Sequence, residues 1–303
     1  MVATPTLVMD KFPDFNEPGF DVDKYNQRFY NSNVVIRASA KSVEYPTHWT
    51  PLSLKCVLQG EEHYETSNSR YLVDASHFLI FNNGKMYSSH IDSPVEVQSF
   101  TLNIAPAFER SALRSIQDSA TQLLDDPFNN DGNEFRFTET LYPHGSFMTG
   151  IMKRIDTTSR KGQSVDLHFY ELMEGLFRLQ TETNSRIRGI GKMKHSTKKE
   201  IFERLVRARD YIHSCYSNDL SVDEMARVAC MNAFYFIRQF RNFFGITPHQ
   251  FLTQRRMDVA KTLLQNNNRS ISEVCFDVGF SDASSFSKLF RRYHGFAPSA
   301  RRM

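Results

Sequence analysis

The sequence predicts an α+β protein in which an antiparallel β-barrel with helices precedes an all-α C-terminal domain. Three observations lead to this fold class. Short runs of strand length fill residues 34–103, a helical pattern follows Pro106, and one helix-forming unit occurs twice in the last hundred residues. A barrel with covering helices, followed by a separate helical domain, accounts for all three.

The size and composition are those of a globular protein. The chain has 303 residues, 40% of them hydrophobic and 23% charged, and a single core stops growing near ~250 residues, so two domains fit. No segment approaches the ~18 apolar residues of a membrane helix, and the first thirty residues lack the apolar stretch of a signal peptide. The four cysteines form no C-x-x-C pair, which favours reduced thiols in the cytoplasm: Cys56, Cys215, Cys230 and Cys275.

The barrel prediction depends on four runs rich in β-branched or aromatic residues. These runs are Ser53–Leu58, Arg70–Val73, Phe78–Phe81 and Val95–Phe100. Residues that tolerate tight turns separate them at 59–61, 67–69 and 82–84. This spacing favours an antiparallel barrel at about residues 30–105, with helices to follow at about 106–185.

Helices are expected over residues 108–124, 146–158 and 164–183. In the last of these, an apolar seam with spacings of three and four is formed by Val165, Phe169, Leu172, Leu176 and Leu179. The seam packs on the chain's own barrel or joins two copies of the chain, because about two heptads are too few to identify a coiled coil. Residues 1–185 are therefore assigned to one domain that includes a candidate dimerisation helix.

A basic linker is expected at residues 186–197, where two glycines occur and acidic residues are absent. The net charge of +3 is unevenly divided about it. Residues 201–303 contain 15 Lys+Arg and 9 Asp+Glu, a net of +6, whereas the first 200 residues contain 22 and 25, a net of −3. A basic domain at 198–303 joined to a slightly acidic one is typical of proteins that present one face to a polyanion.

The repeated unit is the most informative feature of the chain. Residues 236–248 and 286–298 both fit F-x-[RK]-x-F-R-x-[FY]-x-G-x-x-P, with seven matched positions in thirteen. Upstream of each copy lies an S-x-x-E capping box, at 221–224 and at 270–273, and Asn232 and Asp282 are natural N-caps for the helix that follows. Each copy therefore reads as helix, tight turn, helix.

Two helix-turn-helix units are thus expected at about 221–245 and 270–295, joined by a helix at about 249–265 that spans ~25 Å. In such a unit the second helix enters the major groove of DNA, and successive grooves on one face lie ~34 Å apart. A solvated basic face is the alternative interpretation of the cations. The residues expected at DNA are Asn232, Ala233, Phe234, Ile237, Arg238, Arg241, Asp282, Ala283, Ser284, Ser287, Lys288, Arg291 and Arg292.

Residues 200–303 resemble the DNA-binding domain of the AraC/XylS family of bacterial transcription regulators. The segment 271–280, with Phe286, Phe290, Gly295 and Pro298, is similar to the family signature. The resemblance implies a seven-helix domain with two helix-turn-helix units, promoter DNA as a partner, and contact with RNA polymerase, more often for activation than for repression.

Several positions depart from the family pattern. Cys275 stands where the family generally has Ala, and Cys230 where a turn Gly is common, so the first turn is expected to differ slightly. The first recognition helix is unusually apolar, and apolar side chains contact thymine methyl groups without reading hydrogen-bond patterns. Arg238 is therefore the main specific donor expected in that helix.

The strand-rich segment resembles the cupin-like barrel that precedes this domain in ligand-responsive family members. The candidate effector pocket comprises His48, Trp49, Lys55, Tyr87 and His90. No His-x-His pair occurs, so neither a metal nor another cofactor is expected, and no nucleophile elbow, HExxH, phosphate-binding or dinucleotide-binding motif marks an enzyme.

The sequence therefore predicts a cytoplasmic, sequence-specific transcription regulator, an effector-responsive activator that reads two successive major-groove segments with two recognition helices. Its expected partners are double-stranded promoter DNA, RNA polymerase, a small-molecule effector and a second copy of the chain, but no membrane. Two alternatives stay open: a cupin-type metal-dependent enzyme fused to a DNA-binding tail, and a constitutive regulator whose barrel only oligomerises. The effector, the operator and the sign of regulation are not readable from these residues.

Overall fold

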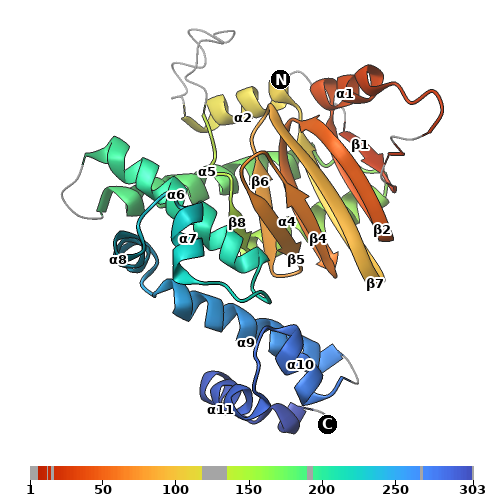
Figure 1. The fold of residues 1–303 in the computed structure, drawn as a ribbon. Coiled ribbons are helices and arrows are strands. Elements are labelled where there is room, and N and C mark those ends of the chain that lie inside the picture. Colours follow the sequence, from red (N-terminus) through yellow and green to blue (C-terminus); the bar gives the residue numbers. More distant parts are fainter. Residues whose placement is uncertain are drawn as a thin grey trace. The chain divides into compact units, whose positions relative to one another are not determined.

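The computed structural model describes residues 6–11, 13–14, 17–117, 135–189, 194–266 and 269–301. It divides into two compact units, Met1–Arg186 and Ile187–Met303 (Figure 1). The first unit contains the strands and four described helices, and the second is helical throughout. The predicted α+β class, with an N-terminal sheet domain and a C-terminal helical domain, is confirmed. No helix in these ranges is long and apolar enough to cross a membrane.

One eight-stranded sheet forms the centre of the first unit. Its hydrogen-bonded order is β1-β2-β7-β3-β6-β8, with β4 and β5 attached beside β7. The strands are β1 (Thr6–Met9), β2 (Asn33–Thr50), β3 (Leu52–Gln59), β4 (Glu61–Glu65), β5 (Arg70–Asp74), β6 (His77–Phe81), β7 (Lys85–Ile104) and β8 (Leu141–Pro143). All pairings are antiparallel except that of β1 with β2.

The predicted closed barrel is not what the structure contains. Among the described strands no pairing joins β1 to β8, and β1, β5 and β8 each pair with one neighbour only, so the sheet keeps free edges. The long strands β2 and β7 bend at register shifts after Ala40 and after Tyr45, and β7 pairs with β3 along one half and with β4 along the other. Bulges of this kind curve a sheet, and here the curvature makes a concave face without closure.

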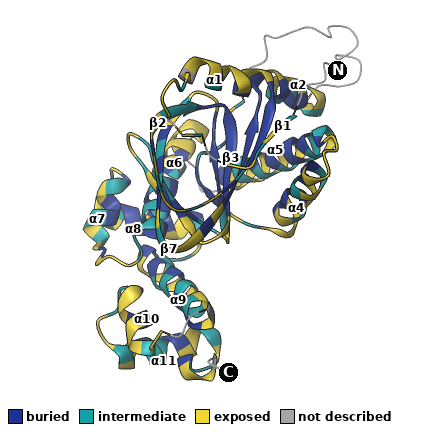
Figure 2. Ribbon diagram, turned by 90° about the vertical axis from the view of Figure 1, so that its right-hand side faces the viewer, coloured by how far each residue is buried: buried dark blue, intermediate teal, exposed yellow. Residues whose placement is uncertain are grey.

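Alternation along the strands divides the side chains between two faces. Leu54 and Cys56 belong to the core cluster that packs against α2 (Pro106–Gln117), α4 (Ser146–Arg160) and α5 (Asp166–Gly189). Val57 and Tyr87 belong to a second cluster, on the concave face. In Figure 2 the central part of the sheet is dark blue, whereas β2 and β7 also have intermediate and exposed stretches, and α4 and α5 show both dark blue and yellow along their length.

The apolar seam of the helix predicted at 164–183 is covered by the first unit itself. Val165, Phe169, Leu172 and Leu176 are buried in the sheet–helix core, and Leu179 packs against it. Of the helix predicted at 108–124, residues up to Gln117 are helical and the rest lie outside the described residues. A short helix, α1 (Val22–Asn31), was not predicted; it begins at Asp21, whose side chain accepts from Lys24 N.

The second unit has two hydrophobic clusters joined by one long helix. Its helices are α6 (His195–Ser214), α7 (Val222–Val228), α8 (Ala233–Phe244), α9 (Pro248–Asn266), α10 (Ile271–Asp277) and α11 (Ala283–His294), followed by a 3₁₀ turn at Pro298–Arg301. One cluster lies among α6, α7, α8 and the start of α9, and the other among the rest of α9, α10 and α11. The helix α9 thus connects the cluster that contains α7 and α8 to the cluster that contains α10 and α11 (Figure 1).

Local hydrogen bonds begin and end these helices as the sequence predicts. Asn232 accepts from Tyr235 N at the start of α8, and Asp282 accepts from Ser284 N and Ser285 N at the start of α11. Gly245 and Gly295 end the same helices with φ of 79°, a left-handed conformation that glycine adopts without strain. The capping box at 270–273 is complete, because Ser270 and Glu273 each accept a hydrogen bond from the other's backbone N–H. In the box predicted at 221–224, the Glu224 carboxylate instead accepts a hydrogen bond from the Tyr211 hydroxyl at 2.6 Å.

Candidate nucleic-acid interface and effector pocket

The helix α8 buries one stripe and exposes another. Phe236 and Phe240 are fully buried, as the four-residue spacing predicts. Phe234 is 79% exposed, and Ile237, Arg238 and Arg241 are also exposed. Of the other residues expected at DNA, Asn232 is exposed and Ala233 is half-buried. The exposed stripe therefore combines apolar side chains with two guanidinium groups.

The helix α11 has the same arrangement with a more polar exposed stripe. Phe286 and Phe290 are fully buried. The exposed residues from the expected set are Asp282, Ser284, Lys288, Arg291 and Arg292, while Ala283 and Ser287 are half-buried. Ser285 is also exposed next to them and was not predicted, although it lies one position from Ser284 at the helix start. The exposed stripe of α11 thus contains three of the expected cations, and that of α8 contains two.

Two of the residues expected at DNA, Asn232 and Asp282, cap the start of α8 and of α11. The carboxyl of Asp282 accepts hydrogen bonds from Ser285 and Ser284, which lower its pKa, and Asn232 accepts one from Tyr235 N. Arg238 lies with its guanidinium 5.4 Å from the centre of the Tyr235 ring, within the range of a cation–π contact. Arg238 and Lys288 are therefore better placed than the two caps to donate to a ligand.

The two turns differ in the residue that turns the chain. Gly279 has φ of 83° and Cys230, at the equivalent place, has φ of 52°. Cys230 therefore adopts the left-handed conformation itself, in spite of its side chain, and the first turn keeps its form without glycine. Cys275 is fully buried among the residues of the second cluster, and burial raises the pKa of its thiol.

The concave face of the first unit contains a small cavity. Three of the five predicted pocket residues line it: His48, Lys55 and Tyr87. The other two face away, since Trp49 stacks on Tyr30 at 4.6 Å and His90 stacks on His63 at 4.8 Å between ring centres. Adjacent residues of a strand point to opposite faces, which separates Trp49 from His48.

Charge and burial coincide in this cavity. Lys55 is 3% exposed and donates from Nζ to the Tyr87 hydroxyl at 2.8 Å. Glu62, which sequence reasoning missed, is 1% exposed and lines the same cavity. Burial lowers the pKa of Lys55 to about 7 and that of His48 to about 4, and it raises the pKa of the Glu62 carboxyl. The only signal for Glu62 was its place two residues before the apolar Tyr64, on the same strand face.

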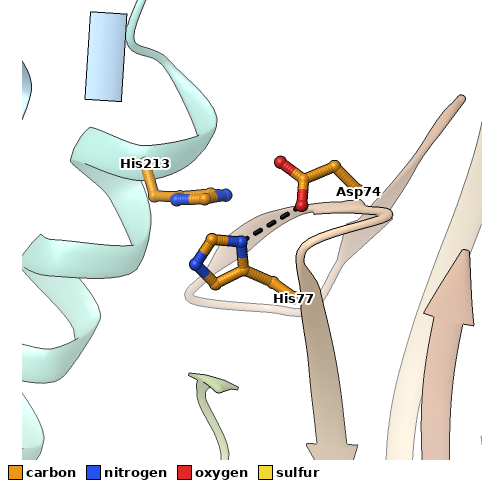
Figure 3. Close-up of side chains that lie close together, drawn as sticks. All are labelled: Asp74, His77 and His213. Atoms are coloured by element: carbon orange, nitrogen blue, oxygen red, sulfur yellow. Dashed lines mark hydrogen bonds and ion pairs between the residues drawn. The ribbon is translucent and has the colours of Figure 1, made fainter. Parts of the chain in front are cut away.

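The turn between β5 and β6 contains a His–Asp pair. His77 Nδ1 lies 3.1 Å from Asp74 Oδ1, the contact dashed in Figure 3, where His213 of the second unit is also drawn. Asp74 also accepts from Ser76 N at 2.9 Å, which forms an Asx turn. The pair thus has a structural role in closing this hairpin.

Comparison with known proteins identifies the second unit. A family model described as a helix-turn-helix domain matches residues 225–303. The chain is 37% identical over 95 residues to the probable transcriptional regulator LumQ of Photobacterium leiognathi, and 30% identical over 123 residues to the regulatory protein PocR of Salmonella typhimurium. These alignments cover 31% and 41% of this chain, and 38% of each relative.

A solved transcriptional regulator from Chromobacterium violaceum, described as having an AraC-type DNA-binding domain, is 25% identical over 33% of this chain and 88% of its own, with a TM-score of 0.32. The C-terminal unit is accordingly a DNA-binding domain of the helix-turn-helix class. This C-terminal segment is similar to the corresponding segments of transcription regulators such as LumQ and PocR, which supports the resemblance to the AraC/XylS family that its signature residues indicate. The chain spans little more than a third of the length of these curated relatives.

Proposed function

We propose that the chain is a sequence-specific regulator of transcription that reads two successive major-groove segments of promoter DNA with α8 and α11. The observation that carries the proposal is the repetition, on these two helices, of the same buried phenylalanine pair beneath an exposed cationic stripe. Buried residues hold each helix in place, and the exposed residues are then available to base edges and phosphates. Activation through RNA polymerase and action as a homodimer in the cytoplasm belong to the same proposal.

The chemistry of the two stripes favours different readouts. Phe234 and Ile237 present apolar surface suited to thymine methyl groups, and Arg238 supplies a donor pair suited to guanine. On α11, Ser284 and Lys288 supply hydrogen bonds, while Arg291 and Arg292 lie further along and suit phosphates. The second helix is therefore expected to discriminate more by hydrogen bonding than the first.

The decisive experiment maps the genomic sites that the full-length protein binds and then measures affinity for one of them. Arg238→Ala and Lys288→Ala should each weaken binding to this site by ~1–3 kcal/mol and relax its sequence preference. Arg292→Ala should weaken binding to all sequences alike and flatten the salt dependence. Lys199→Ala, an exposed lysine of α6, is the matched control. Wild-type affinity and preference in both of the first two variants would refute the assignment of α8 and α11.

We further propose that the first unit senses a small molecule, because its concave face has a cavity into which two charged side chains are directed. A constitutive regulator would keep the same affinity for its promoter whatever small molecule is present. A metabolite screen by thermal shift separates the two, since a ligand at 100 times its dissociation constant adds ~2.7 kcal/mol to stability.

A further inference from the structure

The concave face buries two oppositely charged residues that attract each other but form no close ion pair. Lys55 lies on β3 and Glu62 on β4, and both are more than nine-tenths buried. In the described part of the chain, no ion pair of 4.0 Å or less joins the two. Taking an ion out of water costs several kcal/mol, and titratable groups with strongly perturbed pKa values in a cavity are candidates for a functional site.

Hydroxyl groups hold both side chains in fixed orientations. Lys55 Nζ donates to the Tyr87 hydroxyl at 2.8 Å and lies 4.6 Å from the centre of that ring. The Ser99 hydroxyl donates to Glu62 Oε2 at 2.6 Å. Tyr87 and Ser99 both belong to β7, the strand that pairs with β3 and with β4. One strand therefore positions both charges at the wall of the same cavity.

The size of the cavity limits what can occupy it. Its volume is about 40 Å³, which at ~10–15 Å³ per water is room for about three waters, or for a ligand of a few non-hydrogen atoms. Four tyrosines contribute to its wall: Tyr25, Tyr45, Tyr64 and Tyr87. Tyrosine faces attract cations, and tyrosine hydroxyls both donate and accept.

Charge balance then discriminates among small ligands. A simple anion would be attracted to Lys55 but repelled by Glu62. A simple cation would be attracted to Glu62 but repelled by Lys55. A neutral polyol would leave both charges without a counter-ion. Burial lowers the pKa of Lys55 and raises that of Glu62, so each charge is disfavoured in the empty cavity, and a ligand with one charge of each sign would stabilise both.

We propose that this cavity binds a small zwitterion, an amino acid of the size of glycine or β-alanine, with its carboxylate at Lys55 and its ammonium group at Glu62 among the tyrosine rings. The inference rests on the sensing role proposed for the first unit. It names the ligand chemistry of that site and leaves the DNA-binding assignment independent of it.

The test is calorimetric titration of the full-length protein with glycine and β-alanine. Matched single-charge and neutral probes are acetate, ethylamine and glycerol. We expect saturable binding of a zwitterion with a stoichiometry of one, and binding of the three other probes weaker by about tenfold or more, because each lacks one or both charge-assisted hydrogen bonds. Acetate or glycerol binding as tightly as the zwitterions, or no saturable binding of either amino acid, would overturn the proposal.

Variants separate the site from the fold. Lys55→Met and Glu62→Gln should each weaken zwitterion binding by about tenfold or more. Because Lys55→Met leaves Glu62 alone in the core, Lys55→Met/Glu62→Leu provides a charge-balanced variant that should fold and not bind. His90→Ala, on the opposite face of the sheet, should bind as the wild type does. Zwitterion binding retained in the double variant would contradict the site, whereas loss of DNA binding by Arg238→Ala bears only on the proposed function.

Discussion

The turn before α11 allows a direct test of how closely the second unit is packed. Gly279 has φ of 83°, and a Cβ built on it would lie 2.5 Å from the Ser217 carbonyl oxygen and 2.9 Å from Arg256 Nη2. Arg256 cannot easily withdraw, because its guanidinium donates to the carbonyls of Tyr216 at 2.7 Å and Asn218 at 2.8 Å. Gly279→Ala therefore meets both an unfavourable backbone conformation and a steric clash.

The magnitude follows from these two contributions. A left-handed conformation costs a residue with a Cβ ~1–2 kcal/mol, and an added carbon in a packed site costs ~1–3 kcal/mol. Gly279→Ala should thus lower the free energy of unfolding of the second unit by about 2–5 kcal/mol. The opposite change, Cys230→Gly at the equivalent turn, relieves ~1–2 kcal/mol of left-handed strain at φ of 52° and costs ~0.4–1 kcal/mol of unfolded-chain entropy, so it should leave the free energy of unfolding unchanged or raise it by up to about 1.5 kcal/mol.

Urea unfolding followed by far-ultraviolet circular dichroism reports on the helices of both units, whereas fluorescence of Trp49, the single tryptophan, reports on the first alone, so a change seen only in the dichroism is assigned to the second unit. We expect Gly279→Ala to lower the midpoint of the dichroism transition and to leave that of Trp49 unchanged. A Gly279→Ala variant within ~0.5 kcal/mol of the wild type would refute the reasoning from the Cβ contacts. So would a Cys230→Gly variant that is markedly less stable than the wild type.

Two further predictions concern burial. Phe236→Ala should lower the free energy of unfolding by ~3–5 kcal/mol in urea unfolding, because Phe236 is fully buried. Phe234, on the same helix, is 79% exposed, so Phe234→Ala should change stability by less than ~0.5 kcal/mol and yet weaken promoter binding. Equal losses of stability in the two variants would contradict the assignment of the buried and exposed faces. Burial lowers the pKa of Lys55 from 10.5 to about 7, so between these pH values the unfolded chain binds more protons than the folded one. The free energy of unfolding of the wild type, relative to that of Lys55→Met, should therefore rise with pH by about 1 kcal/mol or more across this range. Urea unfolding of both proteins followed by Trp49 fluorescence checks this, and a constant difference would show that Lys55 is not desolvated.

The helical third of the chain was the more predictable part because its signals are local. A cap such as Asn232 acts on a backbone group three residues away, and the buried pair Phe236 and Phe240 lies one helical turn apart. These relations are set by the geometry of the helix and need no knowledge of the rest of the fold. The same kind of local pattern located several of the strands, but it could not show whether the strands close into a barrel.

The sequence by itself determined the division into a strand-rich part and a helical part, the repeated helix pair and the family resemblance of the C-terminal domain, since each depends on residues a few positions apart. Only the tertiary structure decided that the sheet stays open, that Trp49 and His90 face away from His48, and that Glu62 joins Lys55 at one cavity. Those outcomes depend on which strands pair, in which register, and where β2 and β7 bend. A shift of one residue in register reverses the face of every side chain in a strand, so the meeting of two buried charges at one cavity becomes visible only once the register is known.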